Sequence, residues 1–176
     1  RALLEKHLDE LTLSVATELG KNLDEARGDI LKAMEVVEVA CGAPILMQGD
    51  ALMNVSTGHD TVMYREPIGV FAGIVPFNFP AMIPLWMFPM AIVCGNTFVL
   101  KPSEQDPMTP MLLAELALEA GVPPGVFNVV HGGKLAVDTL CTHEEVRAAS
   151  FVGSTHVGHH VYNLASTHGK RAQCMM

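Results

Sequence analysis

Residues 73–104, GIVPFNFPAMIPLWMFPMAIVCGNTFVLKPSE, decide the fold class because they combine an apolar helix with the strands on either side of it. The runs GVFAGIV (69–75) and NTFVL (96–100) show no polar alternation, which is typical of strands buried on both faces of a sheet. Between these runs, residues 80–95 are apolar on every side and predict a packed helix. The stretch also places Asn78 between two phenylalanines and ends on Lys101 and Glu104.

The alternation of strands and helices continues to the end of the chain. Strands are predicted at 125–132, 148–152 and 170–176, and helices at 108–121, 134–143 and 154–169. Strand and helix therefore alternate about five times with short connections. This alternation predicts an α/β fold, with a Rossmann-like parallel sheet covered by helices on both faces.

The first 67 residues have a different pattern. Apolar spacing predicts one helix over 2–19 and a second that Asp24 caps and Gly42 ends. Residues 52–56 and 60–65 predict two strands joined by the turn TGHD. An isolated hairpin is marginal in water, so we expect residues 49–67 to form an arm that pairs with another subunit. Residues 1–48 and 68–176 then make up the α/β domain.

Composition excludes several classes of protein. A 176-residue chain with 49% hydrophobic and 17% charged residues is long and apolar enough to fold around a core. Its net charge of −8 and the lack of a basic cluster weigh against nucleic-acid binding. The apolar run 82–100 is broken by prolines, so no membrane span is expected. The four cysteines have no CxxC spacing, which indicates reduced, buried thiols.

Two further features complete the inventory. His156 and His160 are i, i+4 neighbours, but no Glu follows the first as in HExxH, so we expect partly solvated helix residues and no metal site. The chain begins with Arg1 and ends on AQCMM, which suggests a fragment of a longer polypeptide.

Three polar features follow predicted strands, where ligands bind in a doubly wound fold. Asn78 either caps the helix that begins near Pro80, which the residues alone favour, or donates to a developing oxyanion. Lys101 and Glu104 form either a surface pair or a grip on ribose hydroxyls. The run GSTHVG places N–H groups at a helix start, which favours a phosphate.

Together these stretches resemble the aldehyde dehydrogenase superfamily. PFNFP, GNTFVLKPSEQDP, PPGVFNVVHG and FVGSTHVG occur in its order and at its spacing. Within that superfamily, PLWMFPMAIVCGNTFVLKPSE, EVVEVACG and THGKRAQ are most similar to the CoA-acylating branch of methylmalonate-semialdehyde dehydrogenases.

The resemblance assigns roles to individual residues and makes 1–48 and 68–176 an NAD-binding domain, incomplete here. Asn78 would be the side-chain half of the oxyanion hole. By the resemblance, Val75 and Phe77 would line the nicotinamide side and Ser154 would meet the pyrophosphate. Lys101 and Glu104 would bind the adenosine ribose, with Gln105 beside them, and Gly132 would let the adenine pass close to the backbone.

The resemblance also implies an activity and its partners. The reaction would be NAD-dependent oxidation of methylmalonate or malonate semialdehyde to propionyl-CoA or acetyl-CoA, with CoA as co-substrate. Met175 occupies the position of the general-base Glu of hydrolytic relatives, which favours CoA over water as acyl acceptor. The catalytic Cys is expected outside these residues. We expect a dimer or tetramer, cytoplasmic in a bacterium and in the mitochondrial matrix of a eukaryote.

Two alternatives remain from the residues. One is a hydrolytic aldehyde dehydrogenase of another substrate class. The other is a catalytically inactive NAD-binding or oligomerisation fragment.

Overall fold

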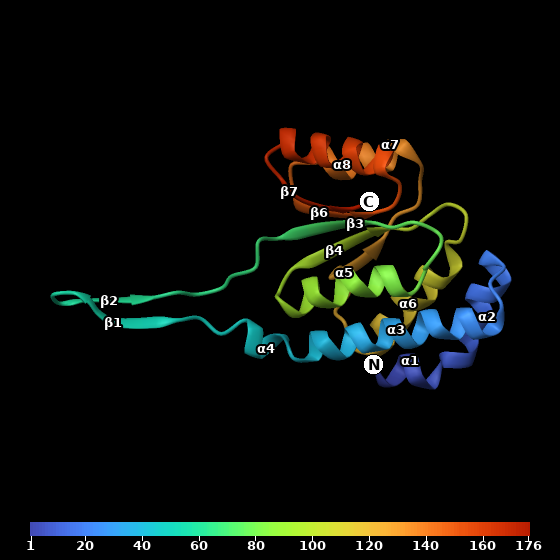
Figure 1. Cartoon of the computed structure of the whole chain (residues 1–176), viewed down its shortest axis with the longest axis horizontal. Coiled ribbons are helices and arrows are strands. Elements are labelled where there is room, and N and C mark those ends of the chain that lie inside the picture. The colour runs from blue at the N-terminus through green and yellow to red at the C-terminus, as the bar shows by residue number, and fades with distance from the viewer.

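The computed structural model describes residues 1–176, and at its centre is a five-stranded sheet (Figure 1). Every neighbouring pair of strands is parallel, and the order is β5-β4-β3-β6-β7. The strands are β3 (Val70–Ile74), β4 (Thr97–Lys101), β5 (Phe127–Val129), β6 (Val146–Val152) and β7 (Arg171–Met175). The predicted α/β fold with a parallel sheet is confirmed.

Helices cover both faces of this sheet (Figure 1). On one face lie α2 (Leu8–Leu19), α3 (Leu23–Cys41), α5 (Met82–Val93) and α6 (Met108–Glu119), and on the other α7 (Lys134–Thr142) and α8 (Thr155–Thr167). Each face has its own apolar core. In the larger one Phe88 stacks on Phe127 with ring centroids 4.0 Å apart, which explains why the α5 run is apolar all round.

A buried asparagine joins α5 to both of its strands. Asn96 accepts hydrogen bonds from the backbone N–H groups of Ile68 (2.8 Å) and Gly69 (3.1 Å), and its amide donates to the Ala91 carbonyl at 3.1 Å. A buried amide left unpaired costs about 1–3 kcal/mol, so these three bonds make Asn96 compatible with the core. They also hold the beginning of β3 against the turn before β4.

The N-terminal region differs in detail from the prediction. The expected helix 2–19 is interrupted at His7, giving α1 (Ala2–Lys6) and α2. Asn22, rather than Asp24, caps α3, because its side chain accepts from the Glu25 N–H at 2.9 Å while Asp24 already lies in the first turn. A short helix, α4 (Ala43–Leu46), follows α3 and had no counterpart in the prediction.

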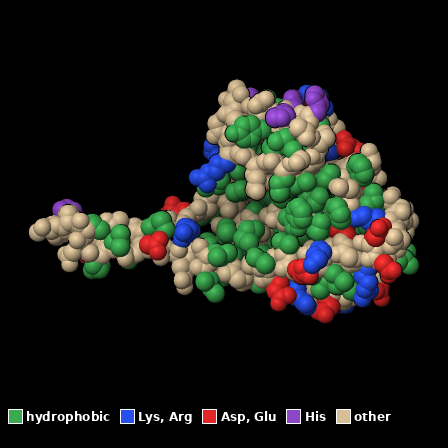
Figure 2. All heavy atoms as spheres, in the orientation of Figure 1, with side chains coloured by type: hydrophobic (Ala, Val, Ile, Leu, Met, Phe, Trp, Pro, Cys, Tyr) green, Lys and Arg blue, Asp and Glu red, His purple; other side chains and the backbone are tan.

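The hairpin extends away from the α/β layers (Figures 1 and 2). Strands β1 (Ala51–Ser56) and β2 (His59–Val62) pair antiparallel, and all their residues are exposed. The turn is Thr57–Gly58, with Gly58 at φ 74°, so β2 begins one residue earlier and ends three residues earlier than expected. The strand register shifts between Leu52 and Ser56.

Two surface properties complete the description. None of the helices combines the length and the apolar character that crossing a bilayer requires. The prediction of buried thiols holds only for Cys141, since Cys41 is exposed and Cys94 and Cys174 are half-buried; all four are free.

Candidate functional site

The order of the strands places a crevice at the middle of the sheet. From β3 the chain adds β4 and then β5 on one side, and returns to add β6 and then β7 on the other. Neighbouring β3 and β6 therefore mark the point where the winding reverses, and ligands of such folds bind there, outside the carboxyl ends of the strands. A cavity of about 480 Å³, here called the main cavity, is lined by the ends of β3, β4 and β6 and by residues of α7 and α8.

Lys101 is the most deeply buried charge in the main cavity. It is the last residue of β4 and only 4% exposed. Its Nζ donates to the Pro102 carbonyl at 2.6 Å and to Glu104 Oε2 at 3.0 Å. Glu104 is 56% exposed, so the pair has a buried cation and an open carboxylate. The alternative of an ordinary surface pair is therefore wrong for Lys101.

The charge on Glu104 is supported by its neighbours. Partial burial acts to raise its pKa, but hydrogen bonds from its own backbone N–H and from Lys101 outweigh this and hold the pKa below the usual value. Glu104 is therefore an ionised acceptor in the main cavity, and Lys101 bonds to only one of its two oxygens, Oε2. Such an arrangement can accept hydrogen bonds from ligand hydroxyls.

Glycines keep the wall of this cavity open. A Cβ on Gly133 would stand 3.2 Å from Glu104 Oε1, and a Cβ on Gly153 only 2.6 Å from Phe151 Cζ. Gly132 has φ 146°, a conformation that L side chains rarely adopt, and it lies beside Gly133 without lining the cavity itself. Side chains at these positions would occupy space that a ligand can use.

Ser154 connects the main cavity to a second one. It is the N-cap of α8, and its hydroxyl makes no capping bond, so the hydroxyl and the N–H groups of the first helical turn are available to an anion. The second cavity, about 370 Å³, is lined by Pro76, Phe77, Asn78, Val152, Gly153, Ser154, Met175 and Met176. Because both cavities share Pro76, Val152, Gly153 and Ser154, they adjoin each other.

Asn78 belongs to the second cavity and caps no helix. Helix α5 begins at Met82 with Ala81 as its N-cap. The Met82 N–H instead donates to Asp29 Oδ1, at 2.9 Å. The Asn78 side chain is exposed and makes no hydrogen bond within the protein, so the predicted capping role is wrong and its two amide donors are free for a ligand.

A charged group on the helical side of the main cavity was missed by the sequence reasoning. His160 Nε2 lies 2.6 Å from Asp138 Oδ1, and Lys134 also pairs with Asp138. Hydrogen bonds from His160 and Lys134 lower the pKa of Asp138. His156 is exposed and His160 half-buried, as expected of partly solvated helix residues, and both also line the main cavity; their i, i+4 spacing was the available signal. No three His, Cys, Asp or Glu residues come close enough to hold a metal ion.

The structure brings most of the predicted site residues together. Val75, Lys101, Glu104 and Ser154 line the main cavity, while Phe77 and Asn78 line the second. Gln105 is exposed and lines neither cavity; its N–H donates to Ser103 Oγ at 3.1 Å.

Fold and cavities first define a class: a doubly wound α/β domain with a nucleotide-sized crevice at its switch point. The aldehyde dehydrogenase family matches residues 1–176 in full. The chain therefore belongs to the aldehyde dehydrogenase family.

Individual relatives are similar over nearly the whole chain. Methylmalonate-semialdehyde dehydrogenase [acylating], mitochondrial, of Arabidopsis thaliana is 56% identical over 99% of this chain and 29% of its own length. Malonate-semialdehyde dehydrogenase 1 of Geobacillus thermodenitrificans is 55% identical over 98% of the chain and 36% of its own length. The structure of a putative methylmalonate-semialdehyde dehydrogenase from Sinorhizobium meliloti 1021 complexed with NAD gives a TM-score of 0.97 at 50% identity, covering 98% of this chain and 35% of that one. The chain thus spans about a third of the length of these relatives.

Proposed function

We propose that the chain is the cofactor-binding part of an NAD-dependent, CoA-acylating aldehyde dehydrogenase acting on methylmalonate or malonate semialdehyde. The observation that carries this proposal is the pair of adjoining cavities, with Lys101 and Glu104 in one and Asn78 in the other. The names of the relatives from Arabidopsis and Geobacillus supply the substrate class.

NAD fits the residues that line the cavities. The exposed carboxylate of Glu104 and the buried Lys101 would hold the adenosine ribose, and the glycine-lined wall at Gly133 leaves room for it. Ser154 and the first turn of α8 would hold the pyrophosphate. Val75 and Phe77 would line the nicotinamide side, from the main and the second cavity respectively. When bound, NAD would accept the hydride from the substrate.

Asn78 would act on the aldehyde itself. Its free amide donates a hydrogen bond to the substrate oxygen as that oxygen becomes negative during attack by a thiolate. A donor fixed before the reaction stabilises this charge without reorganising. None of Cys41, Cys94, Cys141 and Cys174 lines either cavity, so we place the attacking thiolate outside these 176 residues.

The same arrangement of the cysteines favours the second candidate, a fragment that binds NAD without catalysis. If the 176 residues alone produced NADH from an aldehyde and cysteine alkylation abolished this, the thiol would lie within them and both candidates would have to change.

The proposal extends to assembly and compartment. We expect a homo-oligomer, dimer or tetramer, with the hairpin as an assembly element. The Arabidopsis relative is named mitochondrial, so in a eukaryote we expect the matrix, and in a bacterium the cytoplasm.

Asn78→Ala in the complete enzyme tests the proposed role. Loss of an oxyanion donor should lower the acylation rate about 10²–10³-fold. The melting temperature and the NAD dissociation constant should stay close to wild type, because the side chain bonds to nothing in the protein. Asn163→Ala, an exposed asparagine on α8, is the control and should keep the full rate. A variant that melts earlier but reacts normally would return Asn78 to a structural role.

A further inference from the structure

The segment that carries Asn78 begins a helix but brings no side chain of its own to cap it. Residues 79–81 are Phe, Pro and Ala, and none of these can accept a hydrogen bond from the first N–H groups of α5. Asp29, in the middle of α3, supplies the acceptor instead. Its Oδ1 lies 2.9 Å from the Met82 nitrogen, and the residue is only 2% exposed.

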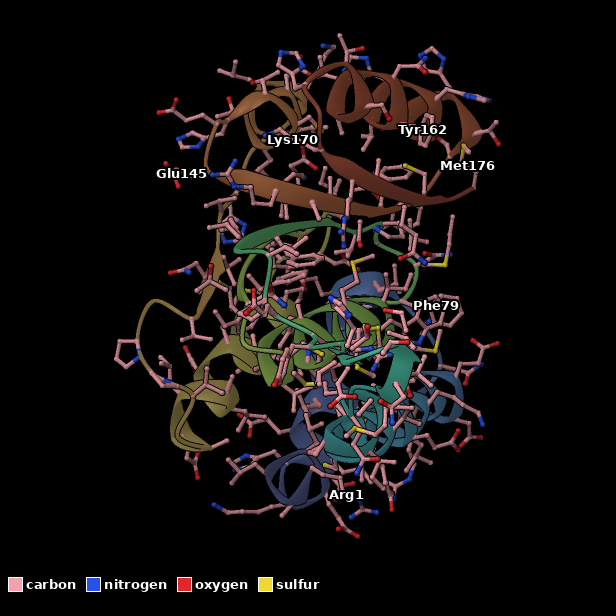
Figure 3. All side chains as sticks on the ribbon, turned by 90° about the vertical axis from the view of Figure 1, so that its left-hand side faces the viewer. Arg1, Phe79, Glu145, Tyr162, Lys170 and Met176 are labelled. Atoms are coloured by element: carbon pink, nitrogen blue, oxygen red, sulfur yellow. The ribbon has the colours of Figure 1, made fainter.

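Lys21 holds the same segment at a second point. Its Nζ lies 3.8 Å from the centroid of the Phe79 ring, makes no hydrogen bond and is shielded from solvent. A cation this close to an aromatic face is attracted to it, more strongly where water is excluded. Phe79 directly follows Asn78, and Figure 3 shows it on the same side of the molecule as Met176, which lines the second cavity.

The two contacts are coupled through the charges around them. Burial raises the pKa of Asp29, while the Met82 N–H and the charge of Lys21 oppose this. Burial also raises the pKa of Asp106 to about 7; the charges of Glu18 and Asp29 add to the increase and Lys21 again opposes it. Lys21 therefore opposes the effect of burial and favours the ionised form of Asp29, which is the stronger acceptor for the Met82 N–H.

The position of Asn78 depends on this support. Its side chain has no hydrogen bond within the protein, so only the backbone of residues 76–82 directs it toward the second cavity. An oxyanion donor must stand about 2.7–3.1 Å from the charge it stabilises, and a misplacement of about 1 Å can cost about 10²-fold in rate.

We propose that Lys21 and Asp29 are positioning residues for the reaction: they fix Phe79 and Met82 and thereby aim the Asn78 amide at the substrate oxygen. This inference rests on the proposed function, because it is the oxyanion role that makes the aim of Asn78 matter. Neither Lys21 nor Asp29 lines either cavity, so both act through the segment and not on the ligand.

Two substitutions at Asp29 in the complete enzyme separate the acceptor from the side chain as such. Asp29→Ala removes the acceptor and should lower the single-turnover acylation rate about 10–100-fold, with the NAD dissociation constant within about twofold of wild type. Asp29→Asn keeps Oδ1 and should recover most of the rate. Asp24→Ala, an exposed acid in the first turn of α3, is the control and should react at the wild-type rate.

A double variant tests whether Asp29 acts through Asn78. In an Asn78→Ala background, Asp29→Ala should cause almost no further loss of acylation rate, because the group that it positions is gone. Lys21→Met should resemble Asp29→Ala with a smaller loss, and Lys21→Arg should recover part of it. A full, additive loss in the double variant would overturn the positioning role, even if Asp29→Ala were also less stable.

Amide hydrogen exchange over residues 79–83 supplies a readout that needs no activity. Asp29→Ala should accelerate exchange there about 10-fold or more, and Asp24→Ala should not. Unchanged exchange would show that Asp29 does not hold residues 79–83 in place. Faster exchange with an unchanged acylation rate would show that holding them does not position Asn78. If Asn78→Ala itself kept the full rate, the proposed function would fail; if only Asp29→Ala kept it, this inference alone would fail.

Discussion

Lys101 shows how burial changes what a charged residue can contribute. At 4% exposure its ammonium has only the Pro102 carbonyl and Glu104 as partners, and it faces the main cavity. Lys101→Met keeps most of the packing volume and removes the charge. We expect the NAD dissociation constant to rise about 10–100-fold, since a hydrogen bond to a charged group contributes about 1.5–3 kcal/mol.

Titration calorimetry of NAD on the complete enzyme measures this effect. Lys32→Met is the matched control, because Lys32 is exposed and pairs only with Glu35. An NAD affinity that Lys101→Met leaves unchanged would remove Lys101 from the cofactor site.

Asp106 makes stability depend on pH in a direction opposite to that of most acids. Burial first, then the charges of Glu18 and Asp29, raise its pKa from the usual 3.8 to about 7. The folded protein therefore keeps a proton that the unfolded chain releases above about pH 4. The free energy of unfolding should fall as pH rises from about 4 to 7, by at most about 1.4 kcal/mol per pH unit.

Asp106→Asn should remove this dependence. The variant should melt at a higher temperature than wild type at pH 8, and at nearly the wild-type temperature at about pH 4, where the unfolded carboxyl is also largely protonated. Melting curves at the two pH values measure it, with Asp24→Asn as an exposed control that should retain the wild-type dependence. Parallel wild-type and Asp106→Asn curves would contradict the argument.

Single residues were predictable where strand order brings them together, and not where a distant side chain decides. Lys101 and Ser154 could be placed near one another from the strands they follow. The sequence could not show that Asn78 leaves α5 uncapped. The residue that caps α5 is Asp29, 53 residues away, and no local pattern predicts such a contact. The burial of Asp106 within a turn of polar residues left no signal in the sequence either.

At the scale of elements, every strand of the main sheet was predicted. The central strands β3 and β4 show no polar alternation because they are buried on both faces, whereas the edge strand β7 alternates between exposed and half-buried residues. Periodicity was less successful at helix ends. The cap at Asn22 depends on which side-chain oxygen reaches a free N–H group, and several nearby residues have such oxygens. The break at His7 has no side-chain capping bond and left no signal in the sequence.

The contacts within the hairpin do not explain how it is stabilised. Both strands are exposed throughout, and Figure 2 shows apolar side chains along it. The exposed apolar residues of the arm are Leu52, Met53, Val55, Val62, Met63 and Tyr64. Because a free two-stranded hairpin is marginal in water, we expect this surface to be covered by another subunit.

Replacing residues 49–67 by a short Gly-Ser linker in the complete enzyme should therefore give a smaller oligomer with an intact α/β domain. Light scattering coupled to size-exclusion chromatography measures the mass, and circular dichroism checks the fold. Thr57→Ser in the turn, which leaves the apolar side chains in place, is the control. A deleted protein with the parent's mass would show that the arm is not needed for assembly.

At the scale of the whole molecule, the sheet separates two cores and gathers one continuous site at the carboxyl ends of its strands. That site ends at Met175, the last residue of β7, which lines the second cavity together with Asn78. The resemblance implies that hydrolytic relatives carry a glutamate at this position, as general base for the water that splits the thioester. We therefore expect the residue at position 175, beside Asn78 in the second cavity, to decide whether water or CoA accepts the acyl group.

Met175 has no proton acceptor of useful strength, so water in the second cavity would lose the about 10²–10⁴-fold that a positioned base supplies. A thioester formed beside Asn78 should then persist until a thiol arrives. CoA needs less help, because a useful fraction of a thiol is already thiolate near neutral pH. We expect steady-state NADH formation by the complete enzyme to depend strongly on CoA.

Met175→Glu tests the CoA dependence by adding the carboxylate that the second cavity lacks at this position. The new carboxylate would stand in the second cavity, and it should restore part of the hydrolysis and relieve part of the CoA requirement. Met176→Glu is the matched control, since it adds the same charge one residue further on in the same cavity. NADH formation by each enzyme is followed with and without CoA, and free acid is separated from acyl-CoA by chromatography. Equal wild-type rates in both conditions, with free acid as the product, would mean that water is activated by another group and that the enzyme is hydrolytic.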